Sequence, residues 1–539
     1  MVLSEAVTPL LDLPAAHLVS GLAADLLKGK GHELLGPLSF LPPGGVLQPR
    51  RLAGERASLA AELAQANQSY GHPRAEELAA RFADPKTVII VSGQQAGVFG
   101  GPLYSLTKMI AVARWAERLV AQGVPAVGVF WVATEDHDFA EVASATFAPA
   151  GATTLALGED AQPLMPVGMR TLGAQLARVL QEIEDLYGSD GSPAGLELLS
   201  SAYRPDARFG EAFSRFMVGL LKERSPLLLD SMLPALKQAQ RPWLRRLVER
   251  RVEVSAALTG AAKRVEGSGY RLQVPEQKGA SPLFVLSDSS RRRVLWEGEE
   301  RWSLRGEKES RHVSSLLEMV DENPGMVSPG VLARLPLQDA VLGSGLQLMG
   351  PGELAYLAQA SSLYPVLEVP APHTALRPQM LVLERAPRRH LQKLGLPLAQ
   401  ILGSEAELDR RLAEGRGVEA MDEARAAVLA QIDDLCGCCL DIDPDLERPW
   451  RKTRDQVERA LGLLSAKACA AAVRRDETLR HRCESVRGAC LPLGRPQERV
   501  LCTAHFVLRY GPGFAARAWD QLDVTSDAIQ IVDPDEVGR

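Results

Sequence analysis

Several features of common protein classes are scarce in this sequence of 539 residues. No uninterrupted apolar stretch approaches the roughly 20 residues that a membrane-spanning helix needs. No basic run precedes an apolar one at the start, so we expect no secretory signal. The net charge of −6 gives no long-range reason to expect a nucleic-acid surface. These absences predict a cytoplasmic globular protein that binds neither nucleic acid nor membrane.

Cysteine occurs only in the last quarter of the chain, which holds all seven. An odd count in a chain of this size argues for reduced thiols rather than a disulfide framework. Cys436, Cys438 and Cys439 could join a metal site. However, a well-spaced second Cys/His pair is missing, and zinc normally takes four ligands. We therefore favour incidental or buried thiols.

Two phosphate-binding signatures are also missing after the first clear strand, a β-branched run at residues 87–91. Neither G-x-G-x-x-G nor G-x-x-x-x-G-K-[ST] follows it, so the pattern argues against a standard NAD site or P-loop. Instead a loop at residues 92–102 carries four glycines, which permit positive φ and close approach of a ligand. Apolar residues then recur at helical spacing after Pro102, which suits a first helical position.

A second apolar run, residues 126–133, leads into an acidic cluster. Strand, glycine loop, helix and strand make a βαβ unit, in which both strands point the same way. Their carboxyl ends therefore share one sheet edge, where open α/β sheets bind ligands. The sequence predicts that the glycine loop and the cluster face each other across one cavity. The candidate residues are Gly93, Gln94, Gln95, Gly100 and Gly101 in the loop and Glu135, Asp136, His137 and Asp138 in the cluster.

The expected chemistry follows from residue type. A helix start favours a phosphate or carboxylate, and Tyr104 and Lys108, four residues apart on one helix face, could add a hydroxyl and a cation. The cluster could hold Mg²⁺, orient an amine or transfer protons. His137 is the favoured base because its reference pKa lies near neutrality. The alternatives are that the glycine loop is a plain tight turn and that the acidic cluster is a solvated cap. The occurrence of the loop and the cluster at one sheet edge favours a site.

We expect an α/β fold: a Rossmann-like parallel-sheet core with an inserted lobe and a C-terminal antiparallel coiled coil. Met421, Val428 and Leu435, and then Trp450, Val457 and Leu464, repeat every seven residues. The predicted core is formed by residues 1–144, which include an N-terminal arm, and by residues 326–390. Residues 145–325 form the inserted region between them. Residues 391–487 form the coiled-coil hairpin, and residues 488–539 return to the core.

The remaining expectations concern the inserted region, a basic run, a second glycine-marked helix and two histidines. The inserted region should contain one long helix at residues 243–266 and strands at 270–274, 282–287 and 293–297. The run Arg291, Arg292 and Arg293 is interpreted as a solvated turn, with a phosphate clamp as the minority alternative. The helix that follows Gly350-Pro351-Gly352 could be a second anion site, or Glu353 could be a plain helix-terminal carboxylate. His481 and His505 are interpreted as surface or packing residues.

The segments VSGQQAGVFGGPLYSLTK and FWVATEDHDFAEV closely resemble the BshC family, the cysteine ligases of bacillithiol biosynthesis. Residues 328–334 with Gln338 and Asp339, residues 350–359 and residues 497–500 resemble its later blocks. Gly330 stands where Asn is expected and Thr107 where an aromatic is usual. Residues 150–273 match poorly.

The resemblance implies a ligase that joins cysteine to glucosaminyl-malate, with a sheet domain like that of class I aminoacyl-tRNA synthetases and nucleotidyltransferases. It implies ATP, through an acyl-adenylate, and homodimerisation by the coiled coil. It also places Arg334 and Asp339 at the site, while Gly352 and Glu353 are candidates from the helix-start argument above. No lysine loop equivalent to that of the synthetases is found. The alternatives are a nucleotide-binding dimeric scaffold or regulatory protein, or a nucleotidyltransferase acting on another amino acid or sugar.

Overall fold

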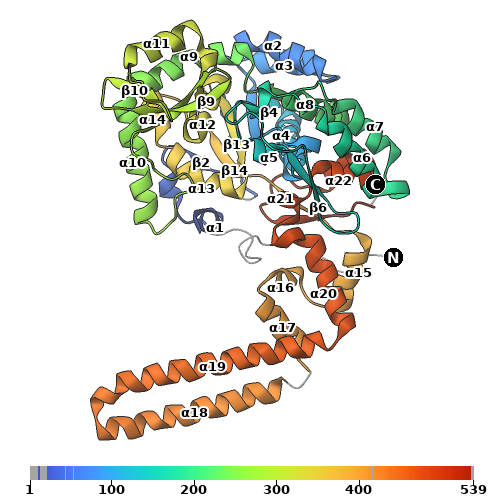
Figure 1. The fold of residues 1–539 in the computed structure, drawn as a ribbon, viewed down its shortest axis with the longest axis vertical. Helices are drawn as coiled ribbons and strands as arrows, with labels where there is room; N and C mark the ends of the chain where they lie inside the picture. The colour runs from blue at the N-terminus through green and yellow to red at the C-terminus, as the bar shows by residue number, and fades with distance from the viewer. Residues whose placement is uncertain (1–9, 12–20, 43, 53, 416–417, 536–539) are drawn as a thin grey trace. The chain divides into compact units, whose positions relative to one another are not determined.

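The computed structural model describes residues 10–11, 21–42, 44–52, 54–415 and 418–535 (Figure 1). It divides into two compact units. The larger contains residues 18–382 and 495–539, and the smaller includes residues 383–494. Within the described ranges, no helix combines the length and the apolar character needed to cross a membrane.

A six-stranded sheet forms the centre of the larger unit, and all its neighbouring strands are parallel. Its strands read as continuous apolar runs because both faces are covered, as parallel sheets require. The Rossmann-like prediction is therefore confirmed. The edge strand β7 comes from inside residues 145–325, so that segment contributes to the core sheet. The spatial order is β2 (Ser39–Phe40), β14 (His373–Leu376), β13 (Ser344–Met349), β3 (Val88–Gln94), β4 (Ala126–Val132) and β7 (Leu227–Asp230).

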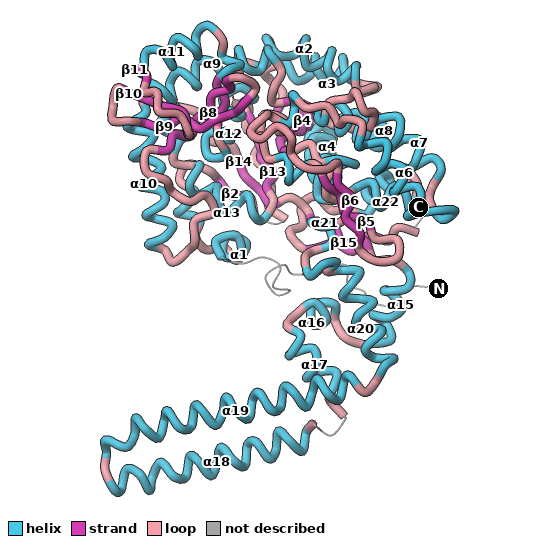
Figure 2. Tube along the Cα trace, in the orientation of Figure 1, coloured by secondary structure: helices cyan, strands magenta, loops and turns pink. Residues whose placement is uncertain are grey.

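Helices cover both faces of this sheet (Figure 2). Alternate residues of each strand point to opposite faces. Thus Ile89 and Val91 pack toward α2 (Arg56–Ser69), α3 (Ala75–Ala83) and α9 (Pro234–Glu249), whereas Val88 and Ile90 pack toward α4 (Tyr104–Ala121). Trp131 extends the first set at the end of β4.

The direction of chain progression reverses between β3 and β13. The chain runs from β3 through α4 to β4 on one side of this point. On the other side it runs from β13 through α13 (Pro351–Ala360) and α14 (Leu363–Leu367) to β14. Connections that diverge in this way leave a crevice outside the carboxyl ends of the two central strands. The fold itself therefore provides a place for a ligand.

A five-stranded antiparallel sheet lies in the inserted region. Asp288 and Ser289 form its hairpin turn with φ of 48° and 61°, the conformation that suits strand twist. The predicted strand at residues 270–274 does not form. The interpretation of Arg291, Arg292 and Arg293 as a turn is wrong, because these residues lie in a strand. The order is β11 (Arg311–His312), β10 (Arg301–Leu304), β9 (Ser290–Trp296), β8 (Ala280–Ser287) and β12 (Val327–Pro329).

The single long helix predicted at residues 243–266 is two helices. The first, α9, ends at Glu249, and α10 (Arg251–Gly267) begins after Arg250, whose φ and ψ of −95° and 28° interrupt the helix. The Arg250 guanidinium donates to the Val366 carbonyl at 2.8 Å and to Glu368 at 2.6 Å. These bonds fasten the break to the end of α14.

Another helical layer packs beside α4 around the hairpin of β5 (Ser144–Phe147) and β6 (Thr153–Ala156). His505 is buried there, with its Nδ1 2.6 Å from the Tyr187 hydroxyl. Burial lowers the pKa of His505 to about 3, so it is a neutral packing residue. The helices of this layer are α6 (Gln175–Tyr187), α7 (Pro193–Ala202), α8 (Phe209–Leu221), α22 (Thr503–Tyr510) and α23 (Phe514–Gln521).

The smaller unit contains the predicted helical hairpin. Its two long helices, α18 (Glu419–Ile442) and α19 (Glu447–Arg474), pack along each other and confirm the coiled coil. The Trp450 indole donates to the Ile432 carbonyl at 2.8 Å, which holds the two helices in register. The hairpin is supported by α15 (Arg385–Leu394), α16 (Leu398–Leu402), α17 (Glu405–Ala413) and α20 (Glu477–Cys490).

Candidate active site

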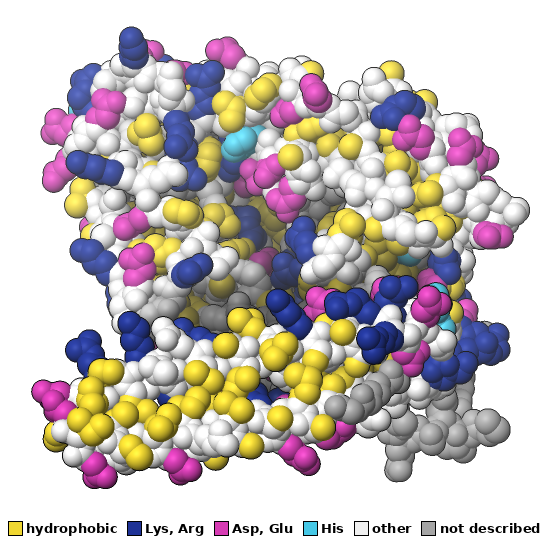
Figure 3. Space-filling view, turned by 60° about the horizontal axis from the view of Figure 1, so that its bottom comes forward, with side chains coloured by type: hydrophobic (Ala, Val, Ile, Leu, Met, Phe, Trp, Pro, Cys, Tyr) yellow, Lys and Arg dark blue, Asp and Glu magenta, His cyan; other side chains and the backbone are white. Residues whose placement is uncertain are grey.

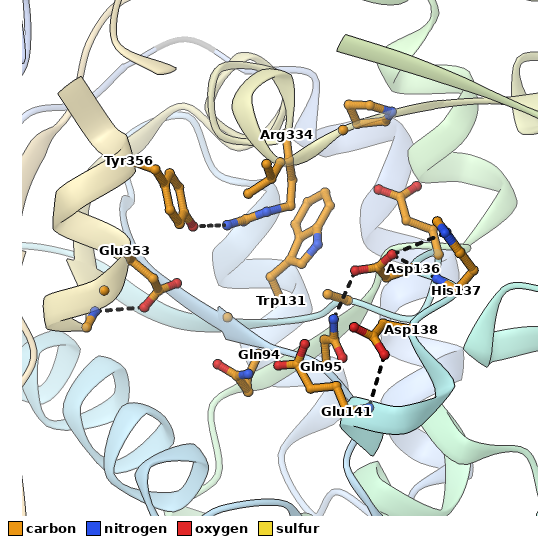
Figure 4. A pocket seen from close by; sticks show the side chains of 18 of the residues that line it. Gln94, Gln95, Trp131, Asp136, His137, Asp138, Glu141, Arg334, Glu353 and Tyr356 are labelled. Carbon is orange, nitrogen blue, oxygen red and sulfur yellow. Dashed lines mark hydrogen bonds and ion pairs between the residues drawn. The ribbon is translucent and has the colours of Figure 1, made fainter. Parts of the chain in front are cut away.

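A cavity of about 580 Å³ lies at the carboxyl edge of the parallel sheet, where the connections diverge (Figure 4). Residues after β3, β4 and β13 form its floor and two sides. Residues of α12 (Val331–Leu342) and of β8 and β9 form the rest. The predicted residues that line it are Gly93, Gln94, Gln95, Tyr104, Lys108, Glu135, Asp136, His137, Asp138, Arg334, Gly352 and Glu353.

The glycine loop and the acidic cluster meet in this cavity. The Gln95 side-chain amide donates to Asp136 Oδ2 at 2.9 Å, which joins the two segments directly. The two strands that carry them are adjacent, with Gly93 paired to Trp131 in the register. The geometry predicted from the βαβ unit is therefore present, because two neighbouring parallel strands end at the same level.

Gly100 and Gly101 do not line the cavity. The Gly100 N–H donates to the buried Tyr203 hydroxyl at 2.7 Å, and the Gly101 N–H donates to the Val98 carbonyl at 3.1 Å. A Cβ on Gly100, where φ is 83°, would lie 2.8 Å from the Phe216 ring. These glycines allow close packing of the loop, and their amides are not available to a phosphate.

Lys108 lines the cavity as part of a fixed network. Its ammonium donates to the Gly93 carbonyl at 2.7 Å and the Gln94 side chain at 3.1 Å, and it pairs with Glu353 at 2.6 Å. An ammonium has three donors, so all are used. Burial alone would raise the pKa of Glu353, but Lys108 and the Gly350 N–H hold it below its ordinary value. The helix start thus holds its own carboxylate, which favours the helix-terminal interpretation of Glu353.

Asp339 lies outside the cavity lining. It accepts hydrogen bonds from the Gln347 amide and the Tyr364 hydroxyl inside the core, and burial raises its pKa. The chain places it on the inward face of α12, while Arg334, five residues earlier on the same helix, faces the cavity. Asp339 therefore braces the helix that presents Arg334.

One wall of the cavity is cationic. Arg334 donates to the Tyr356 hydroxyl at 3.3 Å, and among the described residues no carboxylate forms an ion pair with it. Arg377 forms a buried two-bond pair with Glu498 at 2.7 and 3.0 Å, and Arg499 lies exposed beside it in the lining. Sequence reasoning missed both Arg377 and Arg499. The match at residues 497–500 was the available signal, although it did not show that the C-terminal segment returns to this wall.

Two carboxylates of the acidic cluster are already paired. Glu135 forms a buried ion pair with Lys237 of α9. Asp136 accepts from Arg291 of β9 at 3.2 Å. Each is therefore held by a cation from a segment far away in the sequence, and neither is a free base.

Of the remaining carboxylates, Glu141 lies in the short helix α5 (Phe139–Val142) and Asp138 is the N-cap residue before it. Asp138 caps that helix by accepting from the Glu141 N–H at 3.2 Å. The Glu141 side chain lines the cavity and is in contact with solvent there. Its pKa is raised, first because the cavity walls partly bury the carboxylate and then because of the negative charges of Asp138 and Asp136. Sequence reasoning stopped at Asp138 and missed Glu141, although an acidic N-cap followed three residues later by Glu is a recognisable capping pattern.

His137 is held by Arg291. A guanidinium can only donate, so its contact of 3.3 Å with His137 Nδ1 makes that nitrogen the acceptor. The neutral ring then carries its hydrogen on Nε2. Burial and the Arg291 charge lower the pKa of His137, which keeps the ring neutral. This arrangement makes His137 a hydrogen-bond donor and disfavours the predicted role of base.

Arg291 and Arg293 also line the cavity. Arg291 is only 5% exposed and reaches Ser328 at 2.9 Å, so the basic run contributes structure and charge to the site. No group of three or more His, Cys, Asp or Glu side chains in the described ranges is arranged to hold a metal ion.

The parallel sheet, its ligand crevice and the long helical hairpin define a Rossmann-like protein with a C-terminal coiled coil. Two family models together span most of the chain. "Bacillithiol biosynthesis BshC, N-terminal Rossmann-like domain" matches residues 46–378, and "Bacillithiol biosynthesis BshC, C-terminal coiled-coil domain" matches residues 380–534. The chain belongs to the BshC family of bacillithiol biosynthesis.

Curated relatives match over nearly the whole chain. "Putative cysteine ligase BshC" of Solibacter usitatus is 29% identical over 463 residues, which are 84% of this chain and 86% of the relative. The protein of the same name from Salinibacter ruber is 28% identical and covers 89% of each chain. These names support a ligase of bacillithiol biosynthesis.

Among solved structures, methionyl-tRNA synthetase of Mycobacterium tuberculosis in complex with methionyl-adenylate is similar over 84% of this chain and 99% of its own. The sequence identity is 10% and the TM-score 0.24. A score this low supports no inference about the chemistry of the site.

Proposed function

We propose that this protein joins cysteine to glucosaminyl-malate in an ATP-dependent reaction that forms an amide bond. The observation that carries the proposal is a single cavity with two kinds of wall. Figure 4 shows Arg334 and Tyr356 on one side and Asp138 and Glu141 on another. Such a cavity can hold an anionic group and an amine together, as amide formation from a carboxylate requires.

The cationic wall is the place for the anionic groups. Arg334 and Arg499 come from two separate segments, and a guanidinium binds a phosphate or a carboxylate through two parallel hydrogen bonds, whereas Arg377 already makes its two bonds to Glu498. The glycine loop was the predicted phosphate site, but the amides of Gly100 and Gly101 are bonded within the protein. ATP would supply a good leaving group to the carboxylate, and the arginines would stabilise the charge that develops.

The acidic wall is the place for the attacking amine. An ammonium group has no lone pair, so it must lose a proton before it attacks a carbonyl carbon. Glu141 is the carboxylate in the cavity that forms no ion pair in the described chain and whose pKa is raised, which suits it to accept that proton. His137, as a donor, would orient the substrate.

Exchange of labelled pyrophosphate into ATP tests activation of the carboxylate. We expect exchange that depends on cysteine, and Arg334→Met should lower its kcat/KM for ATP about tenfold to hundredfold through loss of a charged hydrogen bond. Arg271→Met, the same change at an exposed position, is the matched control. Exchange with a different acid would redirect the substrate assignment. No exchange with any acid would favour a nucleotide-binding scaffold.

We further propose that the hairpin forms a homodimer. Leu435 of α18 and Leu464 of α19 are 55% and 56% exposed within one chain, and apolar side chains gather along the hairpin (Figure 3). A two-helix hairpin buries too little by itself, so its apolar surface is suited to a second copy.

Sedimentation velocity tests the dimer. Leu435→Glu should convert the dimer to a monomer because a charge would enter the apolar contact. Ala426→Glu adds the same charge at an exposed position nine residues earlier, on the opposite face of α18 at about 100° per residue, and should leave the dimer intact. A wild-type protein that sediments as a monomer at micromolar concentration would contradict the proposal.

A further inference from the structure

The floor of the cavity holds two polar atoms that are buried but form no hydrogen bond. They are the indole nitrogen of Trp131 and the side-chain oxygen of Gln95. Both residues line the cavity, and Trp131 is 0% exposed. An indole N–H can only donate, and leaving a buried donor without an acceptor costs about 1–3 kcal/mol. Such groups in a cavity wall indicate that a ligand supplies the missing partner.

At the cavity floor, Trp131 lies close to the neighbouring strand. Gly93 of β3 is the register partner of Trp131 in β4. A Cβ on Gly93 would lie 2.8 Å from the Trp131 Cβ. The glycine therefore allows β3 to approach the Trp131 Cβ and carbonyl closely at the end of the strand. This gives Gly93 a role in the site that does not depend on phosphate binding.

The orientation of the Gln95 amide follows from its neighbour. Its nitrogen donates to Asp136 Oδ2 at 2.9 Å. A carboxylate only accepts, so exchanging the nitrogen and oxygen of the amide would place two acceptors together. The Gln95 oxygen is therefore the free atom, and it is an acceptor.

The pair of free atoms selects a chemical class. A carboxylate or phosphate could accept from Trp131 but could not donate to Gln95. An ammonium could donate to Gln95 but could not accept from Trp131. A hydroxyl group can take either role, and a sugar ring carries several hydroxyl groups, so one ligand of this class can meet both atoms through separate hydroxyls. In Figure 4, Trp131 lies between Arg334 and Asp136, and Gln95 lies between Asp136 and Glu141.

We infer that Trp131 and Gln95 form a hydroxyl-recognising subsite that binds the sugar ring of the acceptor. The inference rests on the proposed function, in which the acceptor substrate contains a sugar. It adds the two residues that bind the sugar hydroxyls. The anionic part of the same molecule would lie toward Arg334, and its amine toward Glu141.

Equilibrium binding of glucosaminyl-malate, measured by calorimetry without ATP or cysteine, tests the subsite. Trp131→Phe keeps an aromatic side chain but removes the N–H, and we expect the Kd to rise about fivefold to tenfold. Gln95→Met should have a similar effect. Free malate, which has no sugar, should bind wild type and Trp131→Phe equally, so the loss would be specific to the sugar.

Trp115→Phe is the matched control. The Trp115 indole donates to the Val524 carbonyl at 3.0 Å outside the cavity, so this change removes a formed hydrogen bond and should leave the Kd unchanged. Deoxy analogues of the sugar identify the hydroxyl. The analogue that lacks it should bind wild type and Trp131→Phe with the same Kd.

Unchanged affinity in Trp131→Phe and Gln95→Met, or a wild-type protein that does not bind glucosaminyl-malate, would overturn the inference. Because binding is measured without catalysis, the two proposals fail separately. Sugar binding that depends on Trp131 without any ligation would overturn the proposed function alone. Ligation with normal sugar affinity in both variants would overturn the subsite alone.

Discussion

Glu141→Gln is expected to lower kcat of the ligation reaction at least about 100-fold, since general bases typically contribute 10²–10⁴. The change keeps the size and polarity of the side chain but removes its ability to take a proton. It should leave the fold intact, because the Glu141 carboxylate is exposed inside the cavity. Single-turnover formation of the thiol product is the measurement.

The pH profile distinguishes a base from a binding residue. Glu141 is active when ionised, and burial, then Asp138 and Asp136, raise its pKa above the ordinary 4.5. Activity should therefore fall as the pH drops through a value above 4.5. Asp138→Asn removes one negative neighbour and should move that fall to lower pH. In Glu141→Gln the fall should be absent from the residual activity.

His137→Gln provides the comparison, because glutamine retains a hydrogen-bond donor. We expect a loss of about tenfold or less, as for one neutral hydrogen bond. A larger loss in His137→Gln than in Glu141→Gln would return the base assignment to His137. It would also mean that the contact between Arg291 and Nδ1 breaks when substrate binds.

Lys108→Met is expected to destabilise the larger unit by about 3 kcal/mol, because it leaves the Glu353 carboxylate without its cation. The Lys108 side chain is 2% exposed, and its ammonium joins β3 to the start of α13. The midpoint of urea unfolding, followed by tryptophan fluorescence, is the measurement.

A second substitution tests the cause. Lys108→Met combined with Glu353→Gln removes both charges and should be more stable than Lys108→Met alone. Arg81→Met breaks a solvent-exposed pair with Glu77 and should change stability by only about 0.5 kcal/mol or less. A double variant no more stable than the single one would show that the loss comes from packing rather than from an unpaired charge.

Local pattern predicted the elements that carry the site. The run at residues 87–91, the glycine loop and the apolar run at residues 126–133 became β3, its loop and β4. Parallel pairing followed because a helix of the length of α4 returns the chain to the same end of the sheet. The heptads predicted α18 and α19, since their spacing is a property of one helix face.

The errors arose where distant segments meet. The basic run at residues 291–293 looked like a solvated turn, but in β9 its first arginine reaches Asp136 and His137. That contact also changed the meaning of His137, because the donor on Nδ1 decides which nitrogen keeps the hydrogen. Lys108 looked like a free cation until the fold brought Glu353 beside it.

The sequence alone determined the βαβ unit, the sheet edge at which the polar residues collect and the helical hairpin, because each depends on periodicity and turn chemistry within a short stretch. Only the tertiary structure decided which charges are paired and which remain free. The ionic partner of Lys108, Asp136 or Arg377 comes from a segment more than 100 residues away, so its charge state in the cavity depends on how the whole chain folds.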